Sequence, residues 1–173
     1  MSDEFLSHKF TSKVPTRYAI ALTTYRDSLC IAWVGTTGDL NLAHSYDGGQ
    51  SFDPSSTFTV QETSYSRPSL AVYHDQLYIA WTDVVGNICL MRSTDGGRTF
   101  DHSTKSTSDE STFAIVGKLA VNILLQERTR YDGPSLAVYQ DRLYVAWADV
   151  SHHPCLMFST DGGQTFKIGR AHV

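Results

Sequence analysis

The chain has few of the features that mark several common classes of protein. Its 14 lysines and arginines stand against 18 aspartates and glutamates and form no basic run, so the sequence predicts no nucleic-acid partner. No apolar stretch is long enough for a transmembrane helix, so it predicts no membrane partner either. Residues 1–10 lack the basic-then-apolar order of a signal peptide, and we expect a cytoplasmic location.

Cysteine is scarce as well, with three residues, Cys30, Cys89 and Cys155. They lack the paired spacing of a zinc site. Cys89 and Cys155 both precede Leu-Met and stand at equivalent places in two copies of a repeat, which would hold them far apart. We therefore expect buried, reduced thiols, with no metal site and no cofactor.

What the chain does contain is one phrase that occurs three times. It reads Ser-Tyr-Asp-Gly-Gly-Gln-Ser-Phe at 45–52, Ser-Thr-Asp-Gly-Gly-Arg-Thr-Phe at 93–100 and Ser-Thr-Asp-Gly-Gly-Gln-Thr-Phe at 159–166. The segment at 69–81 also returns almost unchanged at 135–147. Repetition at this scale indicates an array of one structural unit.

The distance from a tryptophan to the following repeated aspartate is constant. The three pairs are Trp33 and Asp47, Trp81 and Asp95, and Trp147 and Asp161. A constant offset indicates that the same elements separate the two residues in every copy. It therefore makes accidental similarity an unlikely explanation of the repeats.

Each unit has the pattern of four short strands. In the middle copy, the first two strands are predicted at 70–73 and 77–81, and the third at 88–92. The run at 77–81 is dense in apolar, aromatic and β-branched residues, which is typical of a buried strand. Asp95-Gly96-Gly97 forms a tight turn, after which Phe100 leads into the fourth strand.

The Asp-Gly-Gly phrase has a structural explanation. The carboxylate can accept N–H bonds within its own turn, and the two glycines supply positive φ. A metal-binding or catalytic role for the aspartates is the alternative, and the structural role explains more of the residue types. The residues assigned to this role are Asp47, Gly48, Gly49, Asp95, Gly96, Gly97, Asp161, Gly162 and Gly163.

The phrase Ser-x-Asp-Gly-Gly-x-Thr-Phe resembles the Asp-box, the bacterial neuraminidase repeat of sialidases and many other β-propellers. The resemblance implies an all-β propeller of four-stranded antiparallel blades, with the Asp-boxes at the blade periphery. A sialidase also needs an arginine cluster, a tyrosine activated by glutamate, an aspartate acid/base and an Arg-Ile-Pro-type motif. This chain has Val14-Pro15-Thr16-Arg17-Tyr18 instead of that motif, so we assign no catalytic residue.

The repeats divide a single propeller domain, 1–173, into three blades. Their expected bounds are about 17–60, 66–125 and 132–173. The step from Asp95 to Asp161 is longer than that from Asp47 to Asp95, which places an insertion at about 102–121. Residues 5–13 resemble a fourth strand that precedes the first unit, and we expect them to complete the last blade.

Three blades are too few for a closed ring, because propellers usually have four to eight. An open arc would expose apolar sheet faces at both ends. We expect two chains to close head to tail into a six-bladed homodimer. The alternative is that the chain is part of a longer protein.

The candidate ligand-binding residues lie in loops that propeller geometry brings together on one face. They are Tyr65, Arg67, Asp83, Tyr131 and Asp149. Tyrosines offer stacking surfaces, and the charged groups offer hydrogen bonds to a polar ligand such as a glycan. The predicted function is non-catalytic carbohydrate recognition, and the alternatives are an exo-sialidase-type hydrolase and a protein-interaction scaffold.

Overall fold

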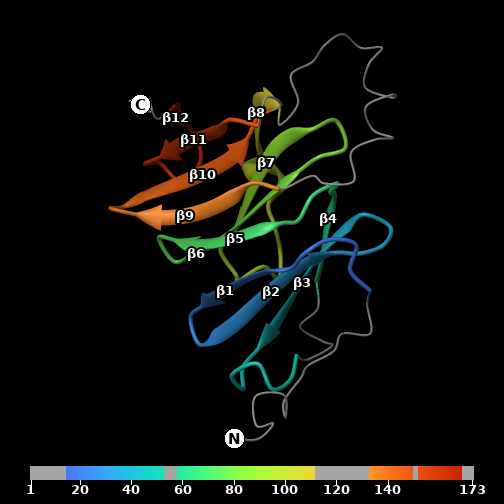
Figure 1. The fold of residues 1–173 in the computed structure, drawn as a ribbon. Helices are drawn as coiled ribbons and strands as arrows, with labels where there is room; N and C mark the ends of the chain where they lie inside the picture. The colour runs from blue at the N-terminus through green and yellow to red at the C-terminus, as the bar shows by residue number, and fades with distance from the viewer. Residues whose placement is uncertain (1–14, 53–57, 112–132, 150–151, 169–173) are drawn as a thin grey trace, which may run out of the picture.

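The computed structural model describes residues 15–52, 58–111, 133–149 and 152–168, which fold into three four-stranded antiparallel sheets (Figure 1). The first sheet contains β1 (Ala21–Tyr25), β2 (Ser28–Val34), β3 (Asp39–Ser45) and β4 (Phe58–Thr63). The second contains β5 (Ser69–Tyr73), β6 (Gln76–Thr82), β7 (Asn87–Ser93) and β8 (Ser106–Ser111). The third contains β9 (Ser135–Tyr139), β10 (Arg142–Ala148), β11 (Pro154–Ser159) and β12 (Lys167–Ile168).

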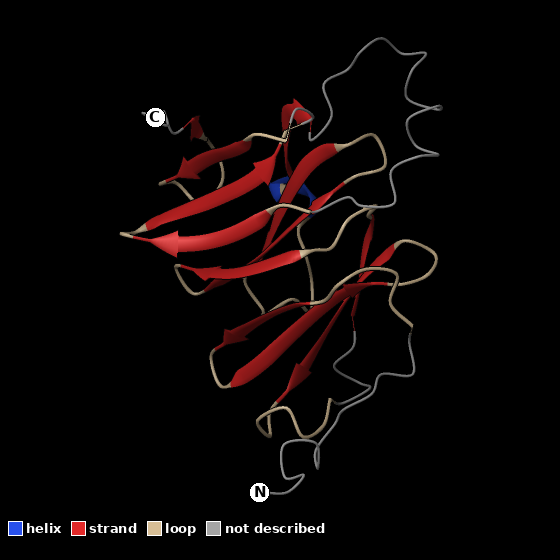
Figure 2. Ribbon diagram, viewed as in Figure 1, coloured by secondary structure: helices blue, strands red, loops and turns tan. Residues whose placement is uncertain are grey.

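The prediction of an all-β chain with three blade-like sheets is confirmed. Strands follow one another in sequence order within each sheet, as in a β-meander. Figure 2 shows strands in all three sheets, and the helix described among these residues is the short 3-10 helix η3 (His102–Thr104). In the described part of the chain, no helix is long and apolar enough to cross a membrane.

The sheets stack through their first strands, so that β5 lies between β1 and β9 (Figure 1). The core fills the spaces between successive sheets. Leu42 of the first sheet and Trp81 of the second belong to one cluster, while Tyr78 of the second and Leu143 of the third belong to another. All four side chains are buried, as expected for sheets packed face to face.

The fourth strand of the second sheet lies where the sequence predicted an insertion. Residues 106–111 pair with β7 as β8, inside the insertion expected at about 102–121. The segment Ser-Thr-Ser-Asp-Glu-Ser has no apolar residue, so its hydrophobicity pattern gave no strand signal. An edge strand pairs through its backbone on one side, which allows a wholly polar sequence to occupy this position.

The outer strand of the third sheet is β12, which contains two residues and belongs to the C-terminal part of the chain. The strand predicted at 5–13 lies outside the described residues. Its completion of the last blade, and the blade bounds that depended on it, therefore stay predictions.

Candidate functional site

The connection between β4 and β5 positions two of the predicted ligand-binding residues. The buried Ser64 hydroxyl donates to the Thr82 carbonyl at 3.1 Å, and the Thr82 amide donates to the Ser66 hydroxyl at 3.0 Å. The alternate residues, Tyr65 and Arg67, point outward and are exposed. The two serines thus hold the backbone in place while a ring and a guanidinium face solvent.

Arg17 joins this group, although the sequence gave it no role in binding. Its backbone amide donates to the Val34 carbonyl at 2.9 Å, which fixes it beside the end of β2. The Arg17 guanidinium lies 5.8 Å from the centroid of the Tyr65 ring and 5.6 Å from that of Tyr18. A signal was present, because the step that relates Trp33 to Trp81 also relates Arg17 to Tyr65.

Arg67 lies toward the third sheet. Its Nη2 is 3.5 Å from the Ser135 hydroxyl at the start of β9. Within the described residues, neither Arg17 nor Arg67 has a carboxylate partner. We call Arg17, Tyr65 and Arg67 the loop cluster, since an exposed aromatic ring and two cations lie on neighbouring connections and have no acidic partner among the described residues.

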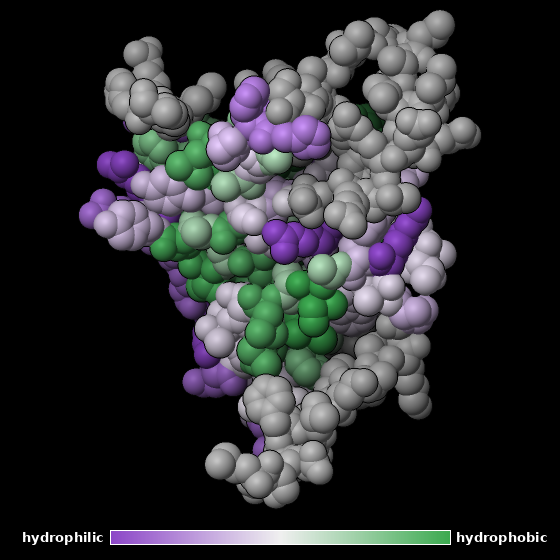
Figure 3. Space-filling view, in the orientation of Figure 1, coloured by the Kyte–Doolittle hydropathy of each residue, from purple (hydrophilic) through white to green (hydrophobic). Residues whose placement is uncertain are grey.

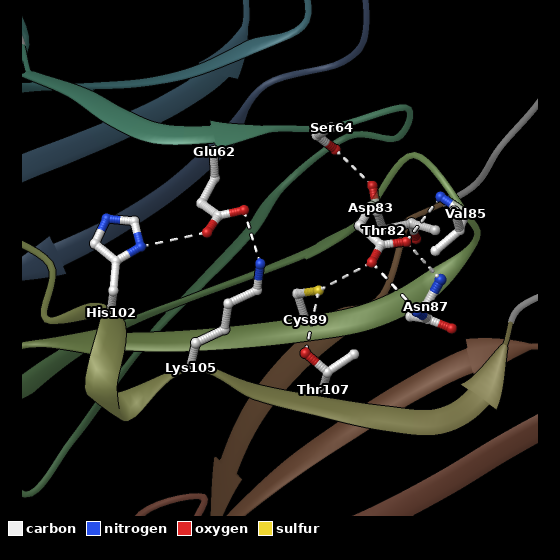
Figure 4. A network of polar contacts seen from close by, with 10 residues as sticks. All are labelled: Glu62, Ser64, Thr82, Asp83, Val85, Asn87, Cys89, His102, Lys105 and Thr107. Atoms are coloured by element: carbon white, nitrogen blue, oxygen red, sulfur yellow. Dashed lines mark hydrogen bonds and ion pairs between the residues drawn. The ribbon is translucent and has the colours of Figure 1, made fainter.

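The Asp83 carboxylate forms hydrogen bonds within its own turn (Figure 4). Its carboxylate accepts hydrogen bonds from the backbone amides of Val85 at 3.0 Å and Asn87 at 2.9 Å. The Cys89 thiol also lies 3.8 Å from it, and burial raises the pKa of that thiol to about 11. Asp83 therefore stabilises the β6–β7 turn beside a neutral thiol.

Asp149 does the same in the third sheet. Its carboxylate accepts from the His153 amide at 2.9 Å, and its carbonyl accepts from the His152 amide at 3.0 Å. Asp83 and Asp149 therefore serve equivalent turns in separate sheets. Tyr131, the remaining predicted residue, lies outside the described residues.

Glu62 links the first and second sheets (Figure 4). Its carboxylate accepts from Lys105 Nζ at 2.8 Å and lies 3.4 Å from His102 Nδ1. Lys105 Nζ also sits 5.5 Å from the centroid of the Trp81 ring. Because two basic groups surround this carboxylate, we interpret Glu62 as an inter-sheet contact and not as an acid/base group.

The three Asp-Gly-Gly turns share one hydrogen-bond pattern. In the first, the Asp47 carboxylate accepts from the Ser45 hydroxyl at 2.7 Å and from the Ser51 amide at 2.9 Å. Hydrogen bonds from Ser51 and Ser45 hold the pKa of Asp47 well below its usual range, and those from Thr165 do so for Asp161. Each carboxylate therefore stays ionised within a closed turn.

A buried cysteine–histidine contact occurs in the first sheet. His44 Nδ1 lies 3.2 Å from Cys30 Sγ and 3.0 Å from the Ser28 hydroxyl. Burial raises the pKa of the Cys30 thiol and lowers that of the His44 imidazole, so both groups are neutral near pH 7. A neutral thiol with no exposed surface is unsuited to nucleophilic attack.

Two hollows lie by the Asp-Gly-Gly turns, away from the loop cluster. One, of about 480 Å³, lies between the second and third sheets, where its walls include Arg92, Asp101 and Gly163. The other, of about 220 Å³, lies between the first and second and includes His44 and Gly96. Within the described ranges, no group of three or more histidine, cysteine or acidic residues could hold a metal ion.

Comparisons with known proteins show the fold. A glycoside hydrolase, GH43_12, retrieved from capybara gut metagenome matches with a TM-score of 0.62 and 12% identity, over 97% of this chain and 33% of that protein. An α-L-arabinofuranosidase (CtGH43) from Clostridium thermocellum matches with a TM-score of 0.59 and 14% identity, over 87% and 50%. The chain is part of a β-propeller. It spans a third to a half of these two proteins.

A lectin from Aleuria aurantia, an N224Q mutant in complex with α-methyl-L-fucoside, matches with a TM-score of 0.50 and 9% identity, over 87% of this chain and 43% of that one. No family model matches the sequence, and no curated protein does. At such low identity, the likeness shows the propeller architecture and not the ligand or the activity.

Proposed function

We propose that the chain is a non-catalytic carbohydrate-recognition module that binds its ligand at the loop cluster. The observation that carries this proposal is the exposed Tyr65 ring, which has the Arg17 guanidinium 5.8 Å from its centroid and Arg67 two residues along the same connection. Neither arginine has a carboxylate partner within the described residues. An aromatic ring offers an apolar surface for the C–H face of a sugar, and guanidinium groups offer paired donors to a carboxylate. An acidic sugar is the ligand class that uses both.

The backbone of this connection is suited to a preformed site. Ser64 and Ser66 are buried, and their hydroxyls bind the Thr82 backbone on the adjacent strand. A fixed backbone reduces the entropy lost when a ligand orders the side chains. The names of two fold neighbours, an α-L-arabinofuranosidase and a lectin with bound fucoside, add support for a carbohydrate ligand.

A sialidase-type hydrolase is the second candidate. It would need a free carboxylate as acid/base, but Asp83 and Asp149 each accept backbone N–H bonds within their own turns. Because both carboxylates already accept these bonds, the arrangement favours recognition without catalysis. A protein-interaction scaffold would use the same exposed cluster for a different partner.

We further propose that a second copy of the chain completes the ring. Three sheets form an arc, and propellers generally need at least four blades. A two-chain ring would bring two loop clusters to one face and give a bivalent surface for glycans.

A glycan array followed by calorimetry tests the recognition proposal. We expect acidic sugars to bind and neutral ones to bind more weakly. Tyr65→Ala and Arg67→Ala should each weaken binding by about 10-fold, given the usual contributions of a stacked ring and a charge-assisted bond. Tyr46→Ala and Arg98→Ala are matched controls near a different edge of the sheets.

Two results would contradict the proposal. If no glycan binds at high micromolar concentration, the scaffold function becomes the better explanation. If the chain hydrolyses a fluorogenic sialoside and Arg67→Ala abolishes turnover, the hydrolase function replaces recognition.

A further inference from the structure

The Asp-Gly-Gly turns of the second and third sheets pack against a leucine of the preceding sheet. A Cβ added at Gly97 would lie 2.9 Å from Leu42 Cδ2, and one added at Gly163 would lie 2.8 Å from Leu90 Cδ2. Leu42 and Leu90 occupy equivalent places in β3 and β7. Each turn therefore packs against a leucine of the preceding sheet, at a separation where an added Cβ would force that side chain to move.

In the described part of the chain, the corresponding turn of the first sheet receives no such side chain. A Cβ at Gly48 would have no heavy atom within 4 Å, and one at Gly49 would meet only Leu29 of the same sheet, at 3.3 Å. In the second sheet, by contrast, a Cβ at Gly96 would lie 2.9 Å from Tyr25 of the first. Within the described residues, the glycines of the first turn therefore lack the contact with another sheet that the later turns make.

The third sheet carries the matching tyrosine on an exposed face. Tyr139 is 63% exposed, whereas its equivalents Tyr25 and Tyr73 are 5% and 2% exposed. Each of those two contacts the following sheet, because Tyr25 donates to the Asp75 carbonyl at 3.2 Å and Tyr73 to the Asp141 carbonyl at 2.9 Å.

Leucines at the two ends show the same contrast. Leu156 is 42% exposed, against 0% for Leu42 and 4% for Leu90 at the equivalent positions. At the other end of the stack, Leu22 is 60% exposed, while the equivalent Leu70 is 7% exposed. Figure 3 shows apolar surface over β1 and around β5 and β9.

Polar residues in the first turn of each sheet complete the repeated contact. Arg26 Nη2 donates to the Asp75 carboxylate at 2.7 Å, and His74 Nε2 lies 2.7 Å from the Asp141 carboxylate. Gln140 occupies the position of Arg26 and His74 in the third sheet, and an amide can donate to a carboxylate in the same way.

We infer that the exposed face of the third sheet docks onto the first sheet of a second copy of this chain. Leu156 then packs against Gly49 of the second copy, and the Tyr139 hydroxyl donates to the Asp27 carbonyl of that copy. The contact continues the two inter-sheet junctions of one chain, and this inference rests on the proposed two-chain ring. A second copy is the occupant because one chain carries both halves of the contact. A head-to-tail contact of this kind closes into a symmetric ring when the rotation fits.

Light scattering on the full chain tests the docking contact. We expect a mass of two copies at micromolar concentration. Leu156→Asp should raise the dissociation constant by about 10-fold or more, because a buried charge replaces an apolar contact. Val85→Asp, at an exposed apolar position in the β6–β7 turn, is the matched control and should leave the mass unchanged.

Substitutions at Gln140 test the predicted partner without disturbing the core. Gln140→Arg reproduces the Arg26–Asp75 pair and should lower the dissociation constant about 3-fold, whereas Gln140→Glu should raise it by a similar factor. A single-copy mass, a mass unaffected by Leu156→Asp, or Gln140 variants in the opposite order would overturn the inference.

Glycan binding measured on the same samples separates the two proposals. A single-copy chain that binds acidic glycans overturns the docking contact and keeps the recognition function. A two-copy particle that responds to the Leu156 and Gln140 substitutions but binds no glycan supports docking and overturns recognition.

Discussion

Two junctions join the three sheets, and they share one set of contacts. They differ in the side chains packed around those contacts. In both, a tyrosine of the earlier sheet donates to a carbonyl of the later one, and a leucine packs on the second glycine of a turn. The first junction adds the Glu62–Lys105 pair and a fully buried Trp81. The two junctions therefore share the tyrosine and leucine contacts and differ in the side chains packed around them.

The comparison also separates structural aspartates from ligand-binding candidates. Asp83 and Asp149 occupy equivalent turns and make equivalent bonds to their own backbones. The loop cluster breaks this equivalence, because Arg17 and Tyr65 occupy the same repeat position with different chemistry. Asymmetry between copies is therefore what distinguishes the loop cluster, our proposed ligand site, from the repeated structural aspartates.

The largest expected effect distinguishes the two junctions by their tryptophans. Trp81→Ala should lower the free energy of unfolding by about 3–5 kcal/mol, because it opens a cavity in a fully buried site. Trp147→Ala, at a position 7% exposed in a less covered sheet, should cost less. Denaturant unfolding at fixed protein concentration measures both. Equal losses would show that the junctions are equally packed.

Much of this architecture was predictable from the repeats. The constant step from Trp81 to Asp95 and from Trp147 to Asp161 predicted three equivalent sheets, and each Asp-Gly-Gly follows a third strand as expected. The wholly polar β8 was missed because hydrophobic periodicity cannot detect an outer strand without apolar residues.

Contacts between sheets were not predictable in the same way. The glycine phrase predicted positive φ, and Gly97 has φ of +92°. That the same glycine also makes room for Leu42 depends on the distance between sheets, which a local phrase does not encode. The pairing of Arg17 with Tyr65 likewise required the spatial arrangement of two connections.

The second prediction compares the turn at Gly97, which packs against the preceding sheet, with the turn at Gly48. Asp95→Ala should lower the free energy of unfolding by about 1–3 kcal/mol, since the amide and hydroxyl of Thr99 lose their acceptor. In a single chain, Asp47→Ala should lower it less, because no described residue of another sheet lies within 4 Å of a Cβ at Gly48; the docking contact inferred above would reduce this difference. Thermal melting of both variants, with glycan binding as a control for retained structure, makes the comparison. A larger loss for Asp47→Ala would contradict it.

The third prediction concerns acid. Hydrogen bonds hold the pKa of Asp47 and Asp161 below their usual range; for Asp95, burial opposes the shift but the bonds from Thr99 and Ser93 outweigh it. A lowered folded-state pKa stabilises the fold above the unfolded value of about 3.9 and ceases to do so as pH falls through the folded one. Melting temperatures should therefore fall below about pH 4.

Asn variants check the cause of that acid loss. Asp161→Asn removes the titrating group, so its melting temperature should start lower at neutral pH and fall less steeply in acid than that of the parent chain. If Asp161→Asn and the parent lose stability in parallel below about pH 4, other carboxylates are responsible for the acid transition.

The smallest expected effect comes from the exposed polar pairs that link the first turns of successive sheets. Arg26 and Asp75 side chains are 58% and 67% exposed, and those of His74 and Asp141 are 58% and 79% exposed. Exposed pairs contribute little, since water and salt screen them and ordering two side chains costs entropy. Arg26→Ala and His74→Ala should therefore change the unfolding midpoint barely above measurement error, and less again at high salt. A loss of stability as large as that of Asp95→Ala would mean that these pairs, and not the buried leucine and tyrosine contacts, hold successive sheets together.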